Sequence, residues 1–122
     1  MTNRLFDVEE AEAALPMLNE LLPRIRESRR ALIASSARIT EAVQSDGGGV
    51  AGTDWFSAQQ SLRTDLTLLA DEGILLRDPE AGLVDFPAER DGTRVFLCWR
   101  LGEERVAWFH EERAGFSNRR PL

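Results

Sequence analysis

The sequence has a single cysteine, a single histidine, no tyrosine and no lysine. One cysteine cannot form a disulfide within the chain, which fits a reducing compartment. No apolar run approaches the ~18 residues of a membrane-spanning helix, and the acidic N-terminal region differs from a signal peptide. We therefore expect a soluble cytoplasmic protein that does not associate with a membrane.

Positive charge is also scarce. The formal net charge is −6, and arginine supplies all 15 basic residues. An acidic chain of this kind is poorly suited to bind the phosphate backbone of nucleic acids. With 122 residues, of which 43% are hydrophobic, we expect one folded domain over residues 1–122.

Helical signals fill the first part of the chain. Asp7 and Glu10 have the spacing of an N-terminal capping box, and Pro16 fits the first turn of a second helical segment. That segment contains Pro23, which predicts a bend. Mostly apolar residues recur along this segment in steps of three and four, a pattern typical of a coiled-coil seam. Two positions of the pattern are polar. The seam comprises Leu15, Leu18, Leu22, Ile25, Arg29, Leu32, Ser36, Ile39 and Val43.

A second, shorter helix is expected after a glycine-rich loop over Ser45–Thr53, with its end at Gly73. Two helices joined by a short loop pack antiparallel, so a helical hairpin should span about residues 8–73. At 1.5 Å per residue, the first helix is longer than its partner by about 14 Å. This excess leaves Leu15–Ile25 to be buried by a sheet of the same chain or by another protomer.

Three β-strands are predicted between about residues 83 and 111, separated by turn signals that include Asp91-Gly92. The predicted fold is therefore α+β: a long bent helix and a shorter antiparallel helix, packed with a three-stranded antiparallel β-meander. Residues 112–122 show no periodicity and are expected to lie as a C-terminal strap.

The last hairpin of the meander leaves two registers open. With a two-residue turn at Gly102-Glu103, His110 shares the core-facing side of its strand pair with Trp99. A three-residue turn shifts the pairing by one residue and moves His110 to the face that carries Cys98.

Candidate ligands for a metal ion or a small molecule gather in this region. They are Asp85, Glu103, His110 and Glu111, a set of one imidazole and several carboxylates that iron or manganese would accept. Cys98 is a possible reactive thiol, but its place in an apolar strand is more typical of a buried, inert cysteine. Arg119 and Arg120 are possible contacts for an anion.

Four motifs carry a resemblance to a known family. They read RLFDVEEAEAALPML, GLVDFPAERDG, VFLCWRLGE and WFHEERAGFSNRRPL. With them the chain resembles, over nearly its full length, the bacterial family catalogued as domain of unknown function 2203. The family usually has tryptophan directly before the histidine, whereas here Phe109 holds that place and Trp108 precedes it. The resemblance implies a small bacterial cytoplasmic protein and assigns no chemistry.

Two functional hypotheses follow, and the sequence does not decide whether the protein is an enzyme. The unpartnered part of the helix seam favours a non-catalytic interaction domain that self-associates as a homodimer or another homo-oligomer. The crowding of ionisable and aromatic residues near the end of the chain favours a metal- or small-ligand-binding protein, with or without catalysis. Its site would lie around His110, Glu111 and Asp85.

Overall fold

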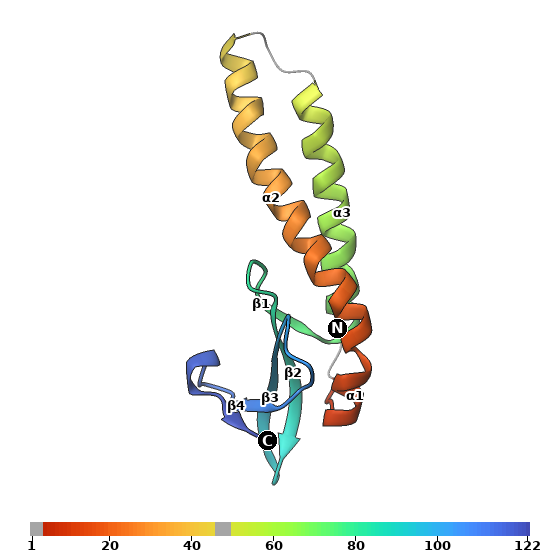
Figure 1. Cartoon of the computed structure of the whole chain (residues 1–122), viewed down its shortest axis with the longest axis vertical. Coiled ribbons are helices and arrows are strands. Elements are labelled where there is room, and N and C mark those ends of the chain that lie inside the picture. Colours follow the sequence, from red (N-terminus) through yellow and green to blue (C-terminus); the bar gives the residue numbers. More distant parts are fainter. Residues whose placement is uncertain (1–3, 46–49) are drawn as a thin grey trace.

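The computed structural model describes residues 4–45 and 50–122, and within them the chain forms a helical hairpin and a five-stranded antiparallel sheet (Figure 1). The helices are α1 Val8–Ala13, α2 Leu15–Ser45 and α3 Val50–Glu72. The strands, in their order across the sheet, are β1 Leu75–Asp78, β2 Leu83–Arg90, β3 Thr93–Arg100, β4 Trp108–Glu111 and β5 Arg120–Pro121. A 3-10 helix, η1 Phe116–Asn118, precedes β5. The α+β class and the helical hairpin are thus confirmed. No helix in the described ranges has the length and hydropathy needed to cross a bilayer.

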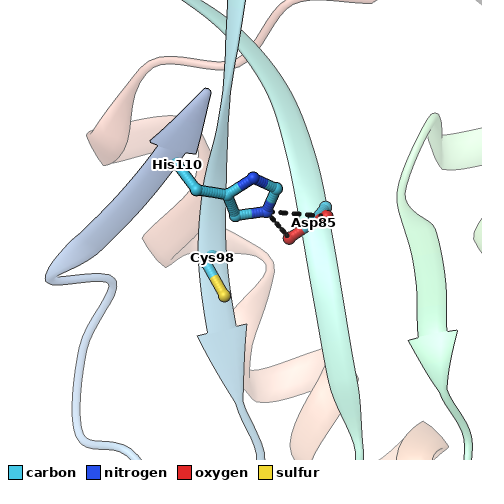
Figure 2. Close-up of side chains that lie close together, drawn as sticks. All are labelled: Asp85, Cys98 and His110. Atoms are coloured by element: carbon cyan, nitrogen blue, oxygen red, sulfur yellow. Dashed lines mark hydrogen bonds and ion pairs between the residues drawn. The ribbon is translucent and has the colours of Figure 1, made fainter. Parts of the chain in front are cut away.

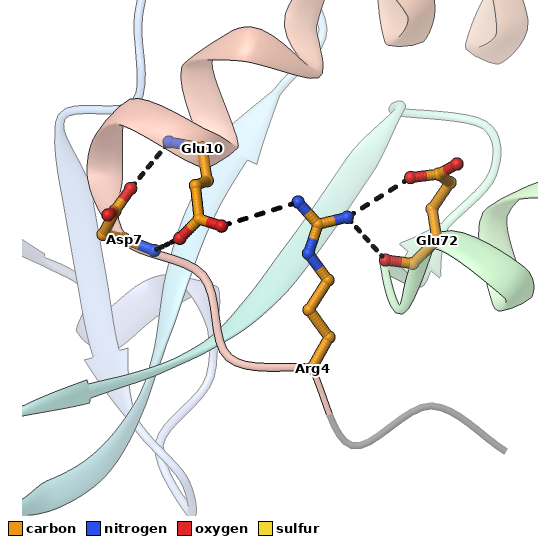
Figure 3. Close-up of polar contacts among 4 residues, drawn as sticks. All are labelled: Arg4, Asp7, Glu10 and Glu72. Atoms are coloured by element: carbon orange, nitrogen blue, oxygen red, sulfur yellow. Dashed lines mark hydrogen bonds and ion pairs between the residues drawn. The ribbon is translucent and has the colours of Figure 1, made fainter.

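The start of the chain is tied to the helical hairpin by polar contacts (Figure 3). The capping box is present: Asp7 Oδ1 accepts the Glu10 amide at 2.7 Å, and Glu10 Oε1 accepts the Asp7 amide at 3.1 Å. Arg4 forms one ion pair with Glu10 at 3.9 Å and a second with Glu72, at the end of α3, at 3.3 Å. The Phe6 amide also donates to the Pro87 carbonyl of β2 at 2.7 Å, so this segment connects the helices to the sheet.

The sheet of the same chain buries the first third of α2. The core contains Leu15, Leu18, Leu21, Leu22 and Ile25 of α2 together with one face of the sheet. That face contributes Val84, Phe86, Leu97, Trp99 and Phe109. The excess length of the first helix therefore needs no second protomer to cover it, and self-association stays a prediction without this support.

Two details of the predicted hairpin are wrong. Between Ile25 and Ala37 the buried positions of α2 are Ser28 and Ser35, so Ser36 is wrong as a seam position, while Arg29 is half-buried at the edge of the seam. Small serines let the helices approach without burying a charge, whereas Arg29 reaches Glu80 at 3.5 Å. The predicted seam positions Ile39 and Val43 lie outside the residues whose side chains are described.

The predicted glycine-rich loop Ser45–Thr53 is also too long. Helix α2 continues to Ser45, and α3 already begins at Val50, so the prediction is wrong over residues 50–53. Residues 46–49 of this predicted loop lie outside the described residues. The helix includes a glycine and a threonine near its start, although both residues have weak helix propensity.

The predicted number of strands is wrong because the sheet gains one strand at each edge. Strand β1 follows Gly73, whose φ of +80° ends α3, and pairs with β2. Strand β5 lies within the predicted strap 112–122 and pairs with β4, with Trp108 opposite Pro121. Both edge strands are too short to show a period-two pattern in the sequence.

Of the two registers left open for β3 and β4, the structure has the one that places His110 on the face of Cys98, although the connection is longer than either predicted turn. Strand β3 ends at Arg100 and β4 begins at Trp108, and Phe96 rather than Val95 lies opposite His110. Glu103 stabilises the longer connection, because its carboxylate accepts the Arg100 amide at 2.8 Å and its carbonyl accepts the Trp99 indole N–H at 3.1 Å. Phe109 therefore faces the core, and His110 lies on the other face of the sheet with Cys98.

Gly82 offers a test of this packing, since its φ is +71° and an added Cβ would lie 2.7 Å from Leu101 Cβ. We expect Gly82→Ala to lower the free energy of unfolding by more than the ~1–2 kcal/mol that a left-handed conformation costs a non-glycine residue. Gly92→Ala is the matched control, because its φ is +78° and a Cβ there meets nothing within 4 Å. Urea denaturation of both variants measures the difference, and equal losses would contradict the close approach at Gly82.

Candidate functional site

Three potential ligands from three adjacent strands meet on the face of the sheet that points away from the helices. They are Asp85 of β2, Cys98 of β3 and His110 of β4 (Figure 2). One ligand atom from each lies within 4.8 Å of the other two. Asp85 lies directly opposite Cys98, and His110 lies opposite Phe96, two positions from Cys98 on β3, so strand alternation places all three on the same side. Their exposed fractions are only 2%, 0% and 4%, in the order given.

The ring of His110 is held by contacts at both nitrogens. Nδ1 lies 2.9 Å from the carbonyl oxygen of Glu111, which can only accept, so Nδ1 carries a proton and donates it. Nε2 lies 3.1 Å from each oxygen of the Asp85 carboxylate. The contact of Nδ1 with the backbone therefore orients Nε2 toward the cluster. In metal-binding histidines, the nitrogen that does not bind the metal commonly donates to a carbonyl in the same way.

Arg77 of β1 holds the carboxylate of Asp85 from its other side. Its Nε donates to Asp85 Oδ2 at 2.8 Å, and its guanidinium carbon lies 5.0 Å from the centre of the Phe96 ring. Because Asp85 is buried, this charge-assisted hydrogen bond offsets part of the cost of removing the carboxylate from water. Arg77 was missed at the sequence level, because β1 itself was not predicted.

Arg119 of the C-terminal segment influences Cys98. It forms an ion pair with Glu103 at 2.9 Å and is near enough to the thiol to lower its pKa. Its guanidinium also lies over two aromatic rings, 4.2 Å from the centre of Phe116 and 4.7 Å from that of Trp108. The pKa of the Cys98 thiol is raised to about 11, first by burial and then by the charge of Asp85, and Arg119 opposes this shift. The thiol is therefore protonated at neutral pH.

The raised pKa predicts a loss of stability in alkali. The thiol has an ordinary pKa of 9.0 and a folded-state pKa of about 11, so its contribution to stability is complete below pH 9 and disappears as the pH rises through 11. Because the chain has no lysine and no tyrosine, Cys98 is the side chain that titrates in this window. We expect urea denaturation in the presence of a chelator to show a decline between pH 9 and 11. Cys98→Ala should flatten it, and an equal slope in that variant would contradict the assignment.

A pocket of about 340 Å³ opens beside the cluster. Asp85 and His110 form part of its wall, so they can be reached from it although they are buried. The segment between β4 and β5 closes one side. The lining consists of Arg77, Leu83, Asp85, His110, Glu112, Ala114, Gly115 and Phe116.

The other predicted site residues lie outside the cluster. Glu111 is exposed and forms an ion pair with Arg120 at 2.9 Å. Glu103 binds Arg119 and the main chain of the β3–β4 connection. The two tail arginines are thus engaged with carboxylates, and their role as anion contacts stays a prediction.

The arrangement suits ligation better than nucleophilic catalysis by Cys98. A catalytic thiol needs a base that takes its proton, and its pKa is usually lowered. Here both nitrogens of His110 are directed at oxygen atoms, and burial raises the pKa of the thiol. Three different donor atoms that converge on one point are, in contrast, what a metal ion requires.

Comparisons with known proteins agree with the motifs in the sequence. Neither the curated proteins nor the solved structures contained a match to the chain. A family model does match, and it spans residues 4–122, which includes every residue of the cluster and its partners. The chain therefore belongs to the family described as "Uncharacterized conserved protein (DUF2203)".

Proposed function

We propose that the protein binds a zinc ion through Asp85, Cys98 and His110. The observation that carries this proposal is that the three donors are buried and converge, and that two of them have a second partner. Arg77 holds the carboxylate and a main-chain carbonyl fixes the imidazole, while Arg119 lies close enough to lower the pKa of the thiol. Such outer partners orient the ligands of metal sites and tune their basicity.

The donor set favours zinc over the iron or manganese suggested by carboxylates alone. Zinc accepts thiolate, imidazole and carboxylate ligands at ~2.0–2.3 Å, and thiolates select it over harder ions. In a tetrahedral site these bond lengths separate neighbouring ligand atoms by roughly 3.3–3.7 Å. Nε2 of His110 and the oxygens of Asp85 are 3.1 Å apart, and all three donors lie within 4.8 Å of one another. Small side-chain adjustments would therefore complete the site.

The charges around Cys98 also favour zinc. Binding of zinc would displace the proton of the Cys98 thiol, since a coordinating thiol is deprotonated by the metal, and Arg119 would favour the thiolate. Asp85 and His110 line the pocket, so a fourth coordination position can be reached from it. Three protein ligands with one open position are typical of zinc sites that bind an exchangeable ligand.

Cobalt(II), which replaces zinc in such sites, gives a direct optical test. Chelator-treated protein should take up one equivalent of Co²⁺ and develop a thiolate-to-cobalt charge-transfer band in the near ultraviolet, and Zn²⁺ should then bleach it. Cys98→Ser is expected to lose the band, because it removes the thiolate. Uptake without this band would show binding elsewhere and overturn the proposal.

A further inference from the structure

We propose that the pocket beside Asp85 and His110 binds a small organic monocarboxylate, whose carboxylate occupies the fourth position on the metal ion and contacts Arg77. This inference rests on the proposed zinc site and names the class of ligand that completes it. It follows from the guanidinium on the wall, the polarity and the size of the pocket.

A guanidinium on the pocket wall offers a contact for an anion. Asp85 and a Cys98 thiolate together would neutralise the two charges of the zinc ion, and Arg77 and Glu112 add one charge of each sign to the lining. Recognition of a carboxylate therefore depends on the N–H groups of Arg77 and not on a net positive charge. The contact of this arginine with Asp85 uses Nε at 2.8 Å, and its side chain is 45% exposed, so its other N–H groups remain within reach of a ligand. A guanidinium presents these groups in the geometry of a carboxylate.

The rest of the lining limits the ligand to one negative charge and an apolar body. Leu83, Ala114 and Phe116 supply apolar surface, which suits a short aliphatic or aromatic substituent. Glu112 also lines the pocket and is exposed, so a second carboxylate on the ligand would meet a like charge. The volume of about 340 Å³ lies at the small end of ligand pockets and fits a compound of the size of benzoate.

Benzoate provides the probe. Titrated into the cobalt-loaded protein, it should change the visible d–d absorption of the ion in a saturable way, because a new ligand enters the coordination sphere. Benzamide and benzylamine have the same ring without the negative charge and should leave the spectrum unchanged. Phthalate, which carries a second carboxylate, should bind more weakly than benzoate.

Arg77→Gln tests the contact that recognises the carboxylate. We expect the dissociation constant for benzoate to rise by about tenfold or more, the effect of losing a charge-assisted hydrogen bond. Arg90→Gln is the matched control: its guanidinium lies 4.4 Å from the centre of the Phe109 ring, much as Arg77 lies over Phe96, but it does not line the pocket. It should bind benzoate as the wild type does.

A second variant separates benzoate binding from metal binding if Arg77→Gln weakens cobalt uptake. Ala114→Phe fills the pocket from the segment after β4 without touching the three metal ligands, and should abolish the benzoate response while the charge-transfer band stays. If the wild type shows the charge-transfer band but does not respond to benzoate, the proposed carboxylate ligand is wrong and the zinc site is still supported. Absence of the band itself would overturn both.

Discussion

Replacing His110 with alanine is expected to lower the affinity for zinc by at least ~100-fold, because loss of an outer partner alone costs 10–100-fold. His110 supplies the nitrogen donor of the cluster and is 4% exposed, so water cannot easily replace it with the same geometry. Competition with a chromophoric chelator measures the affinity. Urea denaturation of the chelator-treated variant verifies that it is folded, which is expected because Asp85 keeps its ion pair with Arg77.

Glu111→Ala is the matched control for this experiment. Glu111 is the adjacent residue and was itself a ligand candidate in the sequence, but its carboxylate is exposed and paired with Arg120. Its backbone carbonyl, which accepts from His110, remains in the variant. We therefore expect zinc affinity within about threefold of wild type, a change below ~1 kcal/mol. Equal losses in the two variants would count against the cluster as the binding site.

Trp99→Ala should have the largest effect on stability, a loss of about 3–5 kcal/mol in the free energy of unfolding. Trp99 is 0% exposed in the core between the sheet and α2, and its indole N–H donates to the Glu103 carbonyl at 3.1 Å. The substitution thus removes a large buried ring and leaves the carbonyl without its donor. Since a domain of this size has a total stability of only ~5–15 kcal/mol, the variant should be marginally folded.

Phe56→Ala provides the control, because it removes an aromatic ring that is 65% exposed on α3. A surface substitution of this kind should change the free energy of unfolding by no more than ~0.5 kcal/mol. Urea denaturation compares both variants with the wild type. A loss at Phe56 equal to that at Trp99 would show that the exposed face of α3 is buried in solution, as self-association would require.

Local sequence signals explain which parts of the fold could be predicted. The capping box at Asp7, the restart at Pro16 and the end of α3 at Gly73 each depend on residues close in sequence, and all three are present. The edge strands β1 and β5 depend instead on partners far along the chain, with Leu75 opposite Asp85 and Arg120 opposite Phe109. Short segments of this kind acquire their conformation from pairing, which propensity does not record.

The site was predictable residue by residue but not as a cluster. Asp85, Cys98 and His110 each stood out by chemical type, and the carboxylates Glu103 and Glu111 stood out equally. Whether His110 meets Cys98 depends on a shift of one residue between β3 and β4, because a strand reverses its faces at every position. The contacts of Glu103 stabilise the connection between these strands, and no pattern of hydrophobicity encodes them.

A crystal of the zinc-loaded protein, measured at the zinc absorption edge, tests the metal site most directly. We predict an anomalous peak ~2.0–2.3 Å from Cys98 Sγ, His110 Nε2 and one oxygen of Asp85, with its open side toward the pocket. No peak at this position, or a peak only on exposed carboxylates such as Glu111, would contradict it. In that case the ion pair of Asp85 with Arg77 and its contact with His110 would be structural features of the sheet.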